Sequence, residues 1–138
     1  MADASELFRV SAKAVVVKDN CVLLLRTPAG VWDLPGGRLE PHEELEASLV
    51  RELHEEMGVS IPIGPVIYCA ARRRAAPKQN VVVVAYLCTM KAELEQVVLS
   101  SEHDEIRLFG ADEIMALGLV DSYREAVESA FVHMSTMS

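Results

Sequence analysis

The chain has 138 residues, the size of one domain, and we expect a single domain over residues 1–138. Hydrophobic residues make up 51% of it, which excludes an intrinsically disordered protein. Basic side chains number 13 and acidic ones 21, so the formal net charge is −8. This charge repels phosphates at long range, and we expect no binding to polymeric nucleic acid. A small phosphorylated ligand held through metal ions is compatible with it.

Hydrophobic pattern and turn residues predict alternating strands and helices without linkers or repeats. The expected strands are 10–17, 21–25, a short extended piece at 32–34, 66–71, 80–90 and 106–109. The expected helices are 43–57, 111–117 and 121–134. Residues 80–90 are rich in β-branched side chains and indicate a central strand. This order predicts the α/β class, with a mixed β-sheet between α-helices in α-β-α layers.

The cysteines and the N-terminal residues indicate where the protein resides. Cys21, Cys69 and Cys88 are an odd number without a close pair, and each lies in an apolar run, so we expect reduced core thiols. Residues 1–10 lack the apolar segment of a signal peptide. The longest strongly apolar stretch, 81–88, is too short to cross a bilayer. We therefore expect a cytoplasmic protein without a membrane partner.

The predicted helix 43–57 holds an unusual concentration of charge. Residues 43–58 contain six glutamates and one arginine, which is −5 of the total −8. Glu52, Glu55 and Glu56 have the i, i+3, i+4 spacing that places side chains on one helical face. Glu56 falls at the edge of the apolar side of the helix, which is formed by Leu45, Leu49, Val50, Leu53 and Met57.

A row of carboxylates beside a core needs positive charge close to it. Arg51 lies four residues before Glu55 and can pair with it, but one arginine cannot neutralise three glutamates. Carboxylate oxygens favour Mg²⁺ or Mn²⁺, and neither the histidines nor the cysteines have a zinc spacing. The alternative is a solvated acidic face without a ligand, and helix composition alone leaves the two interpretations equally weighted.

The spacing of fixed residues adds a resemblance. Gly37 is followed after five residues by Glu43, and after seven more by Arg51-Glu52-Leu53. One residue later come Glu55-Glu56, and after one more Gly58-Val59. This pattern resembles the complete Nudix box of the Nudix hydrolase family, and the Leu34-Pro35-Gly36 lead-in is typical of that family too. The chain thus resembles a minimal, MutT-like Nudix domain over nearly its whole length.

The resemblance implies a Nudix fold and Mg²⁺-dependent hydrolysis of a nucleoside diphosphate linked to a group X, with Mn²⁺ as a substitute ion. The implied metal ligands are Gly37, Glu52, Glu55 and Glu56. Glu55 is also a candidate proton acceptor, and Arg51 is implied to orient a box glutamate. Glu43 and Gly58 are implied to be structural residues of the box. The resemblance leaves a monomer and a homodimer both open.

Outside the box, Glu105 is the candidate for a further metal ligand or general base just before strand 106–109, with Glu102 as fallback. The alternative is an exposed acidic loop. Five cations are candidates for holding substrate phosphates, against ordinary solvated positions: Arg26, Arg38, Arg72, Arg74 and Lys78.

We therefore expect a hydrolase of a phosphoanhydride in a nucleoside triphosphate, nucleotide sugar or dinucleotide. A nucleotide-sensing module of the same fold that does not cleave its ligand is the alternative.

Overall fold

The computed structural model describes residues 6–136. Its strands are β1 (Phe8–Lys18), β2 (Cys21–Arg26), β3 (Trp32–Asp33), β4 (Gly36–Arg38), β5 (Ile63–Arg72), β6 (Asn80–Thr89) and β7 (Glu105–Phe109). Its helices are α1 (Leu45–Met57), α2 (Ala111–Ile114) and α3 (Asp121–Thr136), with a short 3₁₀ turn at Leu94–Gln96.

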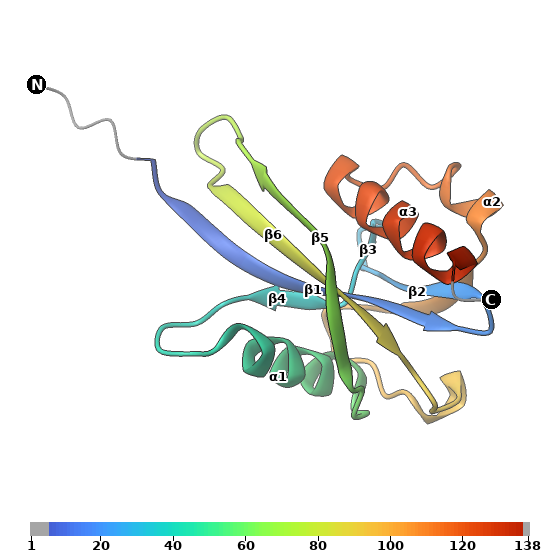
Figure 1. The fold of residues 1–138 in the computed structure, drawn as a ribbon. Helices are drawn as coiled ribbons and strands as arrows, with labels where there is room; N and C mark the ends of the chain where they lie inside the picture. Colours follow the sequence, from blue (N-terminus) through green and yellow to red (C-terminus); the bar gives the residue numbers. More distant parts are fainter. Residues whose placement is uncertain (1–5, 137–138) are drawn as a thin grey trace, which may run out of the picture.

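The strands form one mixed sheet, as the sequence predicts. The order is β3-β2-β1-β6-β5, with β4 paired to β1 and β7 paired to β2. β1 runs parallel to β6 and antiparallel to β2 and β4. Helices α1 and α3 lie on opposite faces of this sheet (Figure 1). The structure therefore confirms the α-β-α layers, and β6 is an internal strand paired on both sides, but β1 is the central strand.

Alternation along β1 divides the core between the two faces. Ala12, Ala14 and Val16 point toward α1 and pack with its buried Leu49 and Leu53. Val15 belongs to the second core, under α3. β2 is buried on both faces, which agrees with its nearly uniform apolar sequence. Because β1 pairs with three strands, it fixes the positions of β4 and of the loop that leads into α1.

The boundaries of α1 follow local chemistry. The helix begins after Glu44, which has extended backbone angles, two residues later than the sequence predicts. It ends at Gly58, where φ is 67°, and the Gly58 N–H donates to the His54 carbonyl at 2.8 Å. A left-handed C-terminal glycine is the expected helix stop.

Several predictions about extent and burial were wrong. β1 and β5 are longer than predicted, so Arg72 lies in a strand and not in a loop, and α2 is shorter than predicted. Val50 is 51% exposed, because α1 covers the sheet with a narrower stripe than its full apolar side. Cys69 is exposed, because β5 is an edge strand and α1 does not reach that part of its face. Cys21 is half-buried, and only Cys88 is a core thiol.

Candidate active site

Strand β4, which lies between β3 and α1 in the chain, brings the backbone of two glycines against the helix and against β1. Gly36 has a φ of 127°, and a Cβ atom there would lie 2.2 Å from the carbonyl oxygen of Ala12 on β1. A Cβ atom on Gly37 would lie 2.6 Å from the carboxylate of Glu52. Gly36 therefore requires glycine for the β1–β4 pairing, whereas a side chain at residue 37 would have to move the flexible Glu52 carboxylate away from the backbone.

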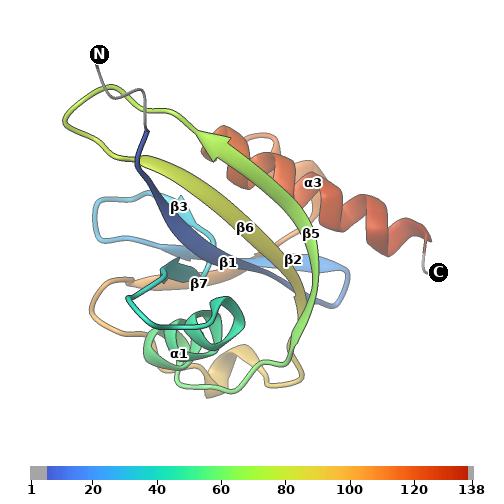
Figure 2. The same ribbon diagram turned by 60° about the vertical axis from the view of Figure 1, so that its left-hand side comes forward.

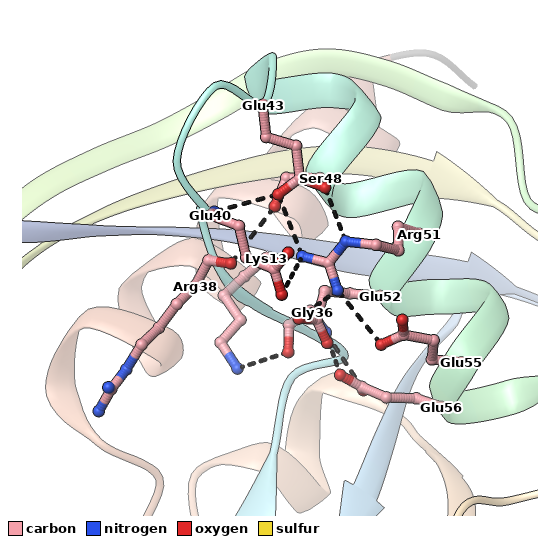
Figure 3. A network of polar contacts seen from close by, with 10 residues as sticks. All are labelled: Lys13, Gly36, Arg38, Glu40, Glu43, Ser48, Arg51, Glu52, Glu55 and Glu56. Carbon is pink, nitrogen blue, oxygen red and sulfur yellow. Dashed lines mark hydrogen bonds and ion pairs between the residues drawn. The ribbon is translucent and has the colours of Figure 1, made fainter.

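Arg51 is the centre of a cluster of carboxylates (Figure 3). Its Nε and Nη2 donate to the two oxygens of Glu43 at 2.6 Å and 3.1 Å, a bidentate pair. Its Nη1 lies 3.1 Å from Glu52 and 3.2 Å from Glu55. The ion pair with Glu55 confirms the i, i+4 prediction, but Glu43 is the stronger partner. These hydrogen bonds raise the pKa of Arg51 and lower that of Glu43 to about 2.

Glu56 is the buried glutamate of the box, with 3% of its surface exposed. Both of its carboxyl oxygens lie 3.3 Å from the backbone N–H of Gly36, which donates to them. Burial raises the pKa of Glu56 to about 8, although the ammonium of Lys13 and the Gly36 N–H act in the opposite direction. The helical wheel therefore placed Glu56 correctly at the edge of the core.

A buried polar group from β1 completes the site, and the box sequence gives no sign of it. Lys13 is 6% exposed, and its ammonium group donates to the carbonyls of Leu34 at 3.1 Å and Gly36 at 3.4 Å. It also lies 3.5 Å from Asp33, whose other oxygen lies 3.9 Å from Nε2 of the buried His103. Burial alone would raise the pKa of Asp33, but the nearby imidazole of His103 and the charge of Lys13 lower it. The signal in the sequence is one lysine inside an apolar strand.

In the structure, Arg51 balances part of the negative charge of the box glutamates. Within residues 6–136, no group of three His, Cys, Asp or Glu side chains stands ready to hold a metal ion. The donors nevertheless fit a hard divalent cation. They are carboxylate oxygens, and the Glu52 carboxylate lies against the Gly37 backbone, in space that a Cβ atom at residue 37 would take. Nη1 of Arg51 lies between Glu52 and Glu55, where positive charge is required.

The remaining predicted residues lie at different places. Glu105 begins β7 and pairs with Arg26 at 3.3 Å, and Arg26 also pairs with Asp104 at 3.3 Å. Neither Glu105 nor Arg26 has a described contact with the box glutamates. Arg38 ends β4, and Figure 3 shows its side chain directed away from the glutamates. Arg72 ends β5, and Arg74 and Lys78 lie in the loop that joins β5 to β6. The structure thus brings together the box residues and separates them from the outlying candidates.

Comparison with known proteins assigns the family. The sequence model of the NUDIX domain matches residues 7–130, and the chain therefore belongs to the NUDIX family. A MutT-like protein of Streptomyces ambofaciens is 30% identical over 117 residues, which are 82% of this chain and 71% of that protein. The crystal structure of a MutT protein from Methanosarcina mazei Go1 superposes with a TM-score of 0.78 at 26% identity. That match covers 96% of this chain and 99% of the other.

Relatives with named activities match over shorter stretches. The CTP pyrophosphohydrolase of Escherichia coli is 38% identical over 66 residues, 44% of this chain and 47% of that protein. The 8-oxo-dGTP diphosphatase of Proteus vulgaris is 36% identical over 66 residues, 44% of this chain and 58% of that protein. These matches thus span about half the length of each relative. As for membranes, none of the helices between residues 6 and 136 is long and apolar enough to cross one.

Proposed function

We propose that this protein is a Mg²⁺-dependent hydrolase that cleaves a phosphoanhydride bond in a nucleoside diphosphate linked to a group X. The observation that carries the proposal is the gathering of Glu43, Glu52 and Glu55 around Arg51, beside the buried Glu56, which accepts from Gly36 at the start of β4. Nucleoside triphosphates and dinucleotides are the proposed substrates. The activities named for the CTP pyrophosphohydrolase and the 8-oxo-dGTP diphosphatase support a nucleotide substrate.

The box residues would hold the ion and the diphosphate in different ways. Glu52, Glu55, Glu56 and the Gly37 carbonyl are the proposed ligands, and Mn²⁺ is an accepted substitute for Mg²⁺. A divalent cation held by these residues would neutralise charge on the diphosphate and lower the pKa of a bound water molecule. The Gly36 N–H donates to both oxygens of Glu56, so this carboxylate would be the most deeply buried of the proposed ligands. Arg51, anchored on Glu43, positions Glu52 and Glu55 through its Nη1.

Two carboxylates are candidates for the proton acceptor. Glu55 has a side chain that is 58% exposed and lies beside the proposed ligands, so water reaches it. Glu105 is held by Arg26 at the start of β7. Replacing each by glutamine and measuring kcat distinguishes them, because loss of the general base lowers kcat by about 100-fold or more. Loss of the other carboxylate changes mainly metal affinity or stability.

The test of the function is a panel of nucleotides incubated with the protein and Mg²⁺, with the products separated by ion-exchange chromatography. We expect a nucleoside monophosphate among the products, and loss of at least about 100-fold in turnover for Glu52→Gln and Glu56→Gln. The matched control is Glu44→Gln, because Glu44 is an exposed glutamate at the start of the same helix without a capping hydrogen bond. Unchanged turnover in Glu56→Gln would contradict the assignment.

The second candidate is a nucleotide-binding module of the same fold without hydrolysis. Tight nucleotide binding in Mg²⁺ without any product would favour it. The single-domain organisation, the cytoplasmic location and a homodimer stay predictions, and light scattering during gel filtration separates a dimer from a monomer.

A further inference from the structure

The cations without a carboxylate partner are not spread over this acidic protein. Seven of the 13 lysine and arginine side chains make an ion pair within residues 6–136. The six that pair with no described carboxylate are Arg9, Arg38, Arg72, Arg74, Lys78 and Lys91. Five of these six lie at the start of β1, at the end of β4 or in the β5–β6 hairpin. In a chain with 21 acidic residues, cations left together without acidic partners indicate a place for an external anion.

The strand register brings part of this group together. Arg9 on β1 and Arg72 on β5 are both paired in register with Val81 on β6. Residues paired in this way point to the same face of a sheet, and two strand spacings separate their Cα atoms by about 10 Å. Two guanidinium groups at that separation can both reach one phosphate placed between them.

The hairpin adds two more cations and a cavity. A cavity of about 560 Å³ is lined by Arg9, Arg74 and Lys78, together with Phe8, Gln79 and Asn80. Figure 2 shows the hairpin beside the start of β1, as the pairing of Phe8 with Asn80 requires. Arg9 also contacts the Gln79 side chain, which leaves its charge uncompensated. We name Arg9, Arg72, Arg74 and Lys78 the hairpin patch.

The hairpin patch lies at a defined distance from the box. Gly37 pairs with Ala12 on β1, and Arg9 lies three residues before Ala12. Three residues of strand correspond to about 10 Å, which is longer than the span of a diphosphate alone. Arg38, which pairs with Ser11, lies between the two places and points away from the glutamates (Figure 3). An anion on the hairpin patch would therefore belong to a part of the substrate remote from the bond that is cleaved.

We propose that the hairpin patch binds a phosphate monoester on the distal part of the substrate, which makes phosphorylated dinucleotides the preferred substrate class. The proposal rests on the proposed function for the position of the scissile diphosphate. Arg9, Arg74 and Lys78 line the cavity that takes the phosphate, and Arg72 adds its charge from the same face of the sheet as Arg9.

Two dinucleotides that differ by one ribose phosphate, NAD⁺ and NADP⁺, test the proposal. Titration calorimetry in EDTA, where no Mg²⁺-dependent turnover takes place, should give an NADP⁺ affinity about tenfold above that of NAD⁺ at low ionic strength. The triple variant Arg72→Gln/Arg74→Gln/Lys78→Gln should bring this ratio close to one. The control is Lys91→Gln, which removes an exposed cation beyond the opposite end of β6 and should keep the wild-type ratio.

The outcomes separate this proposal from the proposed function. A ratio near one in the wild-type protein, or a ratio unchanged in the triple variant, overturns the hairpin patch even if Mg²⁺-dependent hydrolysis is found. A high ratio that the triple variant abolishes supports the patch even if neither dinucleotide is cleaved in Mg²⁺. Stronger binding of a single-stranded oligonucleotide than of NADP⁺ overturns it in favour of a polynucleotide site.

Discussion

Replacement of Glu56 by glutamine should make the metal-free protein more stable at alkaline pH while it removes activity. The carboxyl group is 3% exposed, and its burial raises the pKa from 4.5 to about 8. A carboxyl whose pKa is raised on folding contributes stability below its unfolded pKa and loses it as the pH rises through the folded value. Each pH unit between these values costs about 1.4 kcal/mol, so ionisation of Glu56 destabilises the metal-free protein by about 5 kcal/mol at most.

The glutamine side chain of the Glu56→Gln variant keeps the size of glutamate and still accepts from the Gly36 N–H, but it carries no charge at any pH. We expect wild type and Glu56→Gln to unfold at similar urea concentrations at pH 5 in EDTA. The variant should then gain about 1.4 kcal/mol per pH unit relative to wild type up to pH 8. Mg²⁺ should stabilise wild type more strongly at higher pH, because binding requires the ionised carboxylate, and it should not stabilise the variant.

Urea unfolding at four pH values between 5 and 8.5, with and without Mg²⁺, measures both effects. Glu44→Gln is again the control, and its stability should run parallel to wild type. A constant difference between wild type and Glu56→Gln over this range would refute the reasoning, since it would mean that the carboxyl does not change its charge between pH 5 and 8.

Three further variants test the surroundings of the site. Lys13→Met should lower the free energy of unfolding by about 2–4 kcal/mol, because it leaves two buried carbonyls and a carboxylate without their cation; a urea midpoint equal to wild type would contradict this. Gly37→Ala should have a wild-type circular dichroism spectrum but bind Mn²⁺ about tenfold more weakly, because its Cβ atom displaces the Glu52 carboxylate. An unchanged Mn²⁺ affinity in titration calorimetry would be inconsistent with that contact. Glu43→Gln should reduce kcat about tenfold, because it releases Arg51 from its bidentate pair with Glu43. In the wild-type protein this Arg51–Glu43 pair should persist as the pH falls to 4, since the pKa of Glu43 is about 2. A wild-type kcat in the variant would argue against Glu43 as the residue that holds Arg51 in place.

Much of the fold and of the box could be predicted because the relevant signals are local. Glu56 at the edge of the core follows from the helical period alone, and Gly58 ends α1 because a left-handed residue is needed there. The pairing of Arg51 with Glu43 was missed, because it depends on how the loop before the helix folds back.

The polar network under the site could not be predicted in the same way. Lys13, Asp33 and His103 come from β1, β3 and the loop before β7, and only the sheet register brings them together. The prediction that Val50 belongs to the buried side of α1 was wrong. The helical period gives the direction in which a side chain points but not the width of the surface that covers the helix. Arg72, Arg74 and Lys78 are candidates for phosphate binding from the sequence, but their nearness to Arg9 depends on the strand register.

The guanidinium group of Arg51 has two parts that bind different carboxylates. Nε and Nη2 are committed to Glu43, while Nη1 alone faces Glu52 and Glu55. Under the proposed function, a metal ion bound by Glu52 and Glu55 would therefore displace a single NH₂ group and would leave the rest of the guanidinium in place. Binding of the proposed metal ion would then replace one counter-ion by another, and before it binds Arg51 compensates the charge of Glu43, Glu52 and Glu55.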